Sequence, residues 1–175
     1  DENQRVTLKD IGSKANIRLW AERQGARVHE MQLESQFRCG GSDGYLAWLD
    51  QALQIRNTAN TSIQELGYEF GVCDTATELR DLIVEKNQLA GKTARLVAGY
   101  CWKWNSKTDA GAYDIEFPNE GFQMQWNLAS DSSLWIVKKD SIHQIGCIHT
   151  CQGLEIDYVG VILGADLLVR DGKVV

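Results

Sequence analysis

Hydrophobic positions recur along this chain with two different spacings. Apolar residues three and four apart predict helices over 13–24, 42–53 and 75–83, and the last of these begins with the capping-box pattern Thr75-Ala76-Thr77-Glu78. Short, bounded apolar runs predict strands over 28–33, 68–73, 94–100, 134–137, 144–149 and 158–163. Alternation of this kind favours an α/β fold, with a mainly parallel sheet and helices on both faces.

The middle of the chain follows a different pattern. Tyr113, Ile115 and Phe117 alternate with polar residues, and the same alternation returns over 122–126 after a turn at 118–121. This pattern predicts a β-hairpin inserted into the α/β domain. Pro118 is the only proline and no stretch is rich in serine, so the sequence predicts a single domain over 1–175.

Composition and charge narrow the classes of function. An apolar share of 43% suits a packed globular domain, and no apolar run approaches the ~18 residues of a membrane span. The net charge of −6 argues against nucleic-acid binding by bulk electrostatic attraction, so any such contact would be local. The cysteines are odd in number and scattered, which is typical of a reducing compartment. We therefore expect a cytoplasmic protein that has no membrane partner.

The tripeptide Gly91-Lys92-Thr93 looks like the end of a phosphate-binding P-loop, but its surroundings argue against that role. The pattern requires a glycine five positions before Gly91, where Lys86 stands. A P-loop also leaves a strand and opens a helix, whereas here a helix precedes and a strand follows. We interpret the tripeptide as a helix-to-strand turn, and we expect no ATP hydrolysis by this chain alone.

The most distinctive polar segment covers residues 149–159. His149 and Thr150 follow a predicted buried strand, Gly153 permits a tight turn, and Glu155 precedes the next apolar strand. Polar side chains at the carboxyl ends of parallel strands are where ligands bind in open α/β sheets. The alternative is a strand–turn–strand in which His149 and Glu155 are merely solvated, and the pattern alone leaves both open.

Residues 149–155 resemble motif V of superfamily one helicases, which reads roughly H-[ST]-x-[KQ]-G-L-E before an apolar strand. By that resemblance, His149 and Thr150 are expected to contact the nucleic-acid backbone. Gly153 and Glu155 are expected to line the nucleotide, with Glu155 near the ribose. Many members have lysine where Gln152 stands, so this chain departs mildly from the pattern.

Two further segments resemble helicase motifs. Residues 33–38 are similar to motif IV, so Arg38 is expected to contact the γ-phosphate through its planar, always-charged guanidinium. Taken alone, Arg38 would suit a surface ion pair. Residues 1–4 resemble motif III, whose glutamine, here Gln4, senses the γ-phosphate. The resemblance implies that 1–5 are the tail of a preceding ATPase domain, which would bind ATP with Mg²⁺.

Segments 36–45, 94–102 and 145–150 together are similar to the Schlafen group 3-like DNA/RNA helicase family. The resemblance implies a three-layer RecA-like domain, the C-terminal motor half of a nucleic-acid-dependent ATPase that is inactive by itself. The implied partners are the N-terminal RecA-like domain of the same chain and single-stranded DNA or RNA. A non-catalytic RecA-like scaffold or regulatory module is the alternative, because a fold does not fix a function.

Two other groups leave alternatives open. Trp102, beside Lys103 and Trp104, could stack on a single-stranded base, or one of these tryptophans could pack against the hairpin. Histidines and cysteines also cluster between 143 and 151. A zinc ion needs about four converging ligands, and these cysteines could instead pack in the core, so we predict no metal site.

Overall fold

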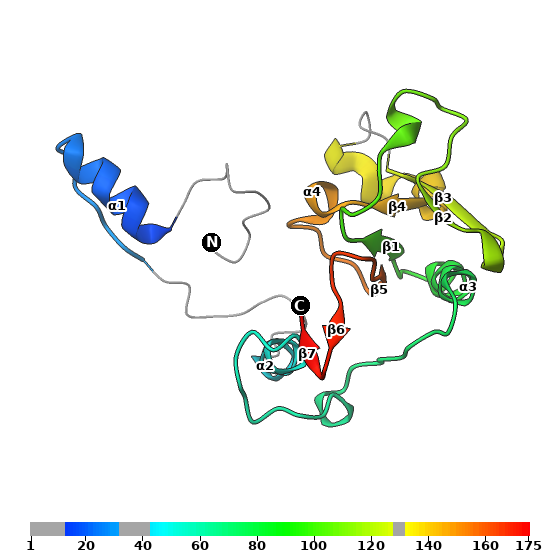
Figure 1. The fold of residues 1–175 in the computed structure, drawn as a ribbon, viewed down its shortest axis with the longest axis horizontal. Coiled ribbons are helices and arrows are strands. Elements are labelled where there is room, and N and C mark those ends of the chain that lie inside the picture. The colour runs from blue at the N-terminus through cyan, green and yellow to red at the C-terminus, as the bar shows by residue number, and fades with distance from the viewer. Residues whose placement is uncertain (1–12, 32–42, 128–131) are drawn as a thin grey trace. The chain divides into compact units, whose positions relative to one another are not determined.

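The computed structural model describes residues 13–31, 43–127 and 132–175, and the chain forms two compact units, Asp1–Gly41 and Ser42–Val175 (Figure 1). The α-helices are α1 Lys14–Arg23, α2 Asp43–Ala52, α3 Ala76–Asn87 and α4 Ile148–Cys151. The 3-10 helices are η3 Gln64–Leu66, η4 Asn105–Lys107, η5 Pro118–Glu120, η6 Ser132–Val137 and η7 Lys139–His143. The strands are β1 Ala94–Ala98, β2 Ile115–Phe117, β3 Phe122–Trp126, β4 Gln144–Gly146, β5 Tyr158–Ile162, β6 Val169–Arg170 and β7 Lys173–Val174.

The described part of the first unit contains the helix α1. The Ser13 hydroxyl caps its first turn, and the chain leaves the helix at Gly25, which has a φ of 67°. This confirms the helix predicted over 13–24. The strand predicted over 28–33 is wrong for residues 28–31, which have no regular structure. Glu30 instead forms ion pairs with Lys14 at 3.0 Å and Arg18 at 2.9 Å on α1.

The second unit is built on a five-stranded sheet in the order β2-β3-β4-β1-β5. The β1–β4, β1–β5 and β3–β4 pairs are parallel, and β2 pairs with β3 in the antiparallel sense. The mainly parallel sheet and the hairpin are therefore confirmed. The second strand of the hairpin joins the parallel sheet through the Trp126–Ile145 pair, so only β2 runs against the others.

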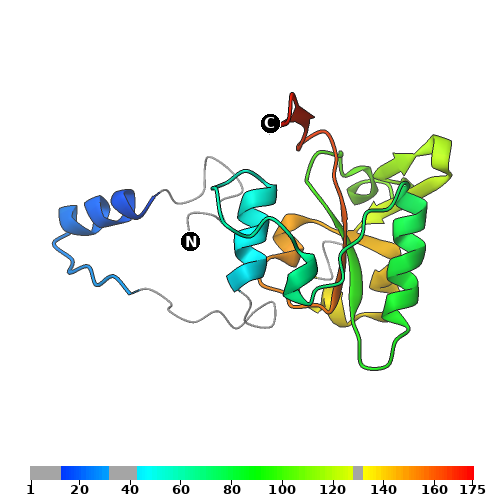
Figure 2. The ribbon, with the colours of Figure 1, turned by 90° about the horizontal axis from the view of Figure 1, so that it is seen from below.

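One face of the sheet is covered by α3, which runs beside β1 and β5 (Figure 2). The helix begins at Thr75, whose hydroxyl accepts a 3.1 Å hydrogen bond from the Glu78 amide, as the capping-box pattern predicts. Its Ile83 side chain lies so close to β5 that a Cβ on Gly160 would come within 2.7 Å of it. The absence of a side chain at Gly160 therefore lets the helix approach the sheet.

The opposite face is covered by η6, η7 and α4. Gly146 on β4 marks this contact, because a Cβ there would collide with the Cys151 sulfur and come within 2.6 Å of the Trp135 ring. Trp135 is buried, and its indole N–H donates to Gln144 at 3.0 Å. Helices thus lie on both faces, as the predicted three-layer α/β architecture requires.

Arg95 connects β1 to the helical segments beside it. Its side chain is buried, and burial lowers the pKa of its guanidinium from the ordinary value. The guanidinium donates to neutral oxygens: Ser141 Oγ at 2.8 Å, Asn87 Oδ1 at 2.7 Å, and the carbonyls of Ala94 at 2.7 Å, Ile136 at 2.6 Å and Lys138 at 3.3 Å. One side chain therefore fixes the end of η6 and the start of η7 against the sheet.

Two further predicted strands are absent from the second unit. Residues 68–73 form no strand, because their aromatic side chains pack on α2 instead: Tyr68 stacks on Tyr45 at 4.5 Å, and Phe70 meets Trp48 edge-on at 5.1 Å. Residues 134–137 belong to η6. In that short helix Trp135 turns inward, while its neighbours on either side are more exposed.

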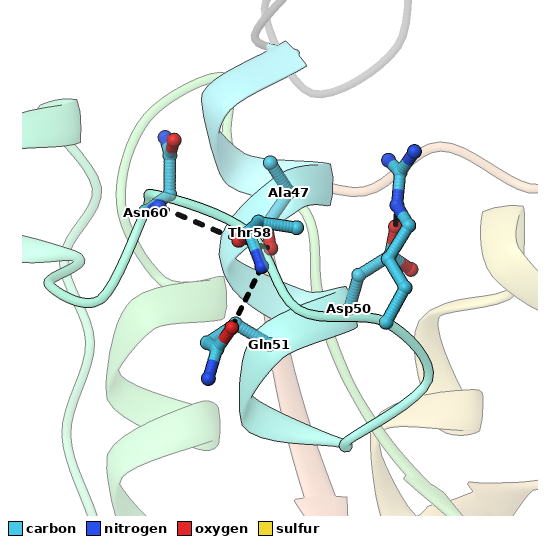
Figure 3. Close-up of polar contacts among 6 residues, drawn as sticks. Ala47, Asp50, Gln51, Thr58 and Asn60 are labelled. Atoms are coloured by element: carbon cyan, nitrogen blue, oxygen red, sulfur yellow. Dashed lines mark hydrogen bonds and ion pairs between the residues drawn. The ribbon is translucent and has the colours of Figure 1, made fainter.

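A loop after α2 folds back along the helix. The Thr58 hydroxyl donates to the Ala47 carbonyl at 2.8 Å, and the Thr58 amide donates to the Gln51 side chain at 2.8 Å (Figure 3). The Gln54 side chain then donates to the carbonyl of Gly172 at 2.8 Å, in the turn between β6 and β7. These bonds connect the C-terminal hairpin to the segment that follows α2.

Candidate functional site

Parallel strands bring separate segments together at one edge of the sheet. Because β3, β4 and β1 are mutually parallel in the order β3-β4-β1, their carboxyl ends lie side by side. Asn127 follows β3, Cys147 follows β4, and Tyr100 lies two residues beyond β1. The sheet therefore places three segments distant in sequence where open α/β sheets bind their ligands.

Asn127 organises this edge. Its side chain is 2% exposed, and it donates to the Thr150 hydroxyl at 2.8 Å. Its carbonyl oxygen accepts from the Cys147 amide at 3.0 Å, while its own amide donates to the Ile145 carbonyl at 2.8 Å. Because the side chain and the backbone amide of Asn127 are all hydrogen-bonded, the start of α4 has a fixed position relative to β3.

The strand predicted over 144–149 ends earlier than expected. β4 stops at Gly146, and His149 and Thr150 lie in α4. The reason is that Asn127 binds the Cys147 amide, which a longer strand would have paired with its neighbour. The helical turn leaves His149 exposed and Thr150 half-buried against Asn127.

Aromatic rings complete the edge. Tyr100 stacks on Trp126 with ring centroids 5.7 Å apart, and it meets His149 edge-on at 6.1 Å. Two of the predicted nucleic-acid residues, His149 and Thr150, therefore lie together with two residues that the sequence reasoning missed. We call these four residues, Tyr100, Asn127, His149 and Thr150, the carboxyl-edge cluster.

Trp102, the third predicted nucleic-acid residue, packs with the hairpin. Its ring meets Phe117 edge-on at 6.1 Å, and it adjoins Gly164, where a Cβ would come within 2.7 Å of it. The side chain is half-buried against the core. This is the packing alternative stated for the tryptophans, and a base-stacking role for Trp102 stays a prediction.

The predicted nucleotide residues Gly153 and Glu155 lie on the segment between α4 and β5. Gly153 adopts a φ of 87°, which favours glycine, and both residues are exposed. The segment reaches the opposite, amino edge of the sheet by Asp157, whose amide donates to the Thr93 carbonyl at 3.0 Å. Glu155 therefore lies two residues before the point at which this segment reaches the amino edge.

The structure confirms that Gly91-Lys92-Thr93 is a helix-to-strand turn. Gly91 has a φ of 69°, and Lys92 forms a 2.8 Å ion pair with Asp157. The hydrogen bond from Lys92 and another from the Thr93 amide lower the pKa of the Asp157 carboxyl, and Asp157 in turn raises the pKa of Lys92. Lys92 is thus engaged at the amino edge of the sheet, at the other end of β1 from the carboxyl-edge cluster.

Arg38 and Gln4, the predicted γ-phosphate residues, lie outside the described residues. Over the described ranges, no three His, Cys, Asp or Glu side chains converge as a metal site would require. Burial, and to a smaller degree Cys147, raises the pKa of Cys151 to about 12, which keeps this thiol protonated.

A sequence signal for Asn127 existed, since it is the polar residue that directly follows an alternating strand. Tyr100 was predicted inside the strand 94–100, and the structure ends that strand at Ala98. The reasoning that selected residues 149–150 applies to both once the strand order is known. That order depends on pairing between distant segments, which the sequence pattern does not contain.

Comparisons with known proteins bear on this geometry. The family model described as "Schlafen group 3, DNA/RNA helicase domain" matches residues 1–175. The uncharacterized protein YPL245W of Saccharomyces cerevisiae is 24% identical over 149 residues, which is 77% of this chain and 32% of the yeast protein. The chain therefore spans about a third of that relative's length. No solved structure matches. None of the described helices has the length and apolar character needed to cross a membrane.

Proposed function

Because the chain belongs to the Schlafen group 3 DNA/RNA helicase domain family, we propose that it is the C-terminal RecA-like half of a nucleic-acid-dependent ATPase. In this proposal the carboxyl-edge cluster contacts the backbone of single-stranded DNA or RNA. A preceding RecA-like domain of the same protein supplies the P-loop, and the protein works in the cytoplasm.

The observation that carries the proposal is the fixed pair of Asn127 and Thr150. The Thr150 hydroxyl accepts from Asn127 at 2.8 Å and lies 3.6 Å from Cys147 Sγ, where either atom could be the donor. Its hydrogen can therefore be donated to that sulfur or to a stronger acceptor that approaches the edge. Phosphate oxygens are acceptors, and hydroxyl donors are among the groups that bind them in nucleic-acid complexes. His149 lies beside Thr150, is exposed, and offers ring nitrogens at the same edge.

The nucleotide side of the proposal depends on the family resemblance. Glu155 is exposed and carries acceptors suited to ribose hydroxyls, and Gly153 has no Cβ to hinder a close approach of the backbone. Arg38 would stabilise phosphate charge, and Gln4 would sense it. ATP with Mg²⁺ would supply the free energy of each cycle. The chain's contribution would be to couple contacts at Arg38 and Glu155 to movement of Thr150 and His149 along the strand.

The test uses the full-length protein that contains this domain. ATP hydrolysis is measured with no nucleic acid and with single- or double-stranded DNA and RNA. We expect single strands to stimulate hydrolysis, and Thr150→Val to raise the concentration for half-maximal stimulation about tenfold, because one hydrogen bond to a charged phosphate is lost. Thr77→Val on α3, whose hydroxyl bonds only within the protein at 3.1 Å, is the matched control and should behave like wild type.

No ATPase at all would favour the alternative of a non-catalytic RecA-like scaffold, and an ATPase that no nucleic acid stimulates would overturn the dependence on nucleic acid. If Thr150→Val and Thr77→Val change the concentration for half-maximal stimulation equally, the assignment of Thr150 as a backbone contact is wrong. The proposal that the protein is a nucleic-acid-dependent ATPase would not be affected.

A further inference from the structure

Tyr100 is a large aromatic residue that is both exposed and held in place. It retains 49% of its accessible surface. Its ring nevertheless stacks on Trp126 at 5.7 Å with an interplanar angle of 28°, and it meets Trp104 edge-on at 6.4 Å. His149 flanks it at 6.1 Å. An exposed tyrosine without such neighbours would sample several rotamers, whereas this ring has a defined orientation before any ligand arrives.

The residue beneath Tyr100 supports this interpretation. Trp126 is completely buried, and its indole Nε1 has no hydrogen-bond partner within the part of the chain that the structure describes. A buried N–H without a partner is destabilising, so hydrogen bonding does not explain an indole at this position. What the indole contributes is a wide ring surface under Tyr100.

The surroundings of Tyr100 supply the remaining requirements of a single-strand site. Lys107 Nζ lies 5.9 Å from the centroid of the Trp104 ring, and Lys103, which precedes Trp104 in the sequence, is exposed. These are local positive charges on a chain whose net charge is −6. Sites that bind single strands combine aromatic rings, on which bases stack, with nearby cations and hydrogen-bond donors for the backbone.

We infer that Tyr100 is a platform on which one unpaired base of single-stranded DNA or RNA stacks, while Thr150 contacts the adjoining backbone. The inference rests on the proposed function and adds to it the part of the substrate that is recognised. A base within a duplex has both faces covered by its neighbours, so this platform selects unpaired nucleotides. Stacking is tolerant of base identity, because every base presents a flat π-face.

The experiment separates base stacking from backbone contact. Fluorescence anisotropy of the full-length protein is measured with labelled oligothymidylate, with oligouridylate, and with an abasic oligodeoxyribose phosphate of equal length. Tyr100→Leu is expected to weaken binding of the base-bearing strands about tenfold and to leave binding of the abasic strand unchanged. Tyr100→Phe and Tyr100→Trp keep an aromatic face and should bind like wild type.

Tyr113→Leu is the matched control. Tyr113 is also a partly exposed tyrosine, at 39%, but it lies just before β2 in the hairpin and is not a member of the carboxyl-edge cluster. The inference is overturned if Tyr100→Leu leaves all three affinities unchanged, or if it lowers them equally, since an equal loss reports disturbed structure. It is also overturned if Tyr100→Phe loses as much affinity as Tyr100→Leu, which would assign the effect to the hydroxyl. If the wild-type protein binds none of the strands, the proposed function itself fails.

Discussion

The side-chain amide of Asn127 donates a 2.8 Å hydrogen bond to the hydroxyl of Thr150, which lies 23 positions further along the chain. The bond connects the residue after β3 to the helical turn after β4, and the same asparagine holds the Cys147 amide at 3.0 Å. Two neighbouring strands are therefore joined at their carboxyl ends by one buried side chain. The position of Thr150, and with it the proposed backbone contact, depends on this bond.

Asn127→Ala is expected to lower the free energy of unfolding by about 1–3 kcal/mol, because the buried Cys147 amide would lose its acceptor. Thr150→Val should cost less, since Thr150 is only half-buried and water can reach it. Urea denaturation followed by tryptophan fluorescence measures both. Asn105→Ala, an exposed asparagine in η4, should stay within about 0.5 kcal/mol of wild type. An Asn127→Ala protein as stable as wild type would contradict this role.

Arg95→Lys is expected to destabilise the domain nearly as much as Arg95→Met, by about 1–3 kcal/mol. A lysine keeps the charge, but its single ammonium cannot reach both Ser141 and the Ile136 carbonyl, which the arginine fork holds at 2.8 and 2.6 Å. Thermal or urea unfolding provides the measurement. At the exposed Arg56 the same change to lysine should have little effect. Wild-type stability of Arg95→Lys would show that charge alone suffices.

Stability should fall as the pH rises from about 9 to about 12, in part through Cys151. Burial raises the pKa of its thiol from 9.0 to about 12, so the folded state favours the protonated form. The contribution of the neutral Cys151 thiol to the free energy of unfolding is fully present below pH 9, where the thiol is neutral in the folded and in the unfolded state. It is lost as the pH rises through the folded value, since only the unfolded chain ionises freely in that interval.

Urea midpoints measured across that pH interval, for wild type and Cys151→Ala, test this prediction. The variant should show a weaker decline with pH. The rate at which iodoacetamide modifies Cys151 in the folded protein should also keep rising up to about pH 12, because the thiolate is the reactive species. An alkylation rate that levels off near pH 9 would contradict the raised pKa.

Lys92→Met in the full-length protein should leave ATP hydrolysis within about twofold of wild type. The ammonium of Lys92 is paired with Asp157 at 2.8 Å at the amino edge of the sheet, so it is not directed at a nucleotide. A P-loop lysine contacts the β- and γ-phosphates directly, and its loss would remove the activity. A drop of several orders of magnitude in the rate of ATP hydrolysis would therefore overturn the interpretation of this turn.

The sequence alone determined the features that depend on neighbouring residues. Thr75 begins α3 because its hydroxyl accepts from the Glu78 amide within one turn, and the Glu78 carboxylate accepts from the Asp74 amide. The strands β1 and β5 follow from continuous apolar runs, and β2 and β3 follow from strict alternation around a turn. The segment 149–155 was identified by its polar residues between two apolar runs and by its resemblance to a helicase motif. These signals are local, and tertiary packing reinforces them.

Tertiary structure decided the features that depend on distant partners. Residues 68–73 and 134–137 have sequences that suit strands. In the structure, however, Tyr68 stacks on Tyr45, and the Trp135 ring packs against Gly146. His149 left the strand because Asn127 bound the Cys147 amide. The order β3-β4-β1 placed Tyr100, Asn127 and Thr150 at one edge. A periodic pattern shows which face of an element is apolar, but it holds no information on which other element will cover that face. The carboxyl-edge cluster forms only because distant strands pair in the order β3-β4-β1.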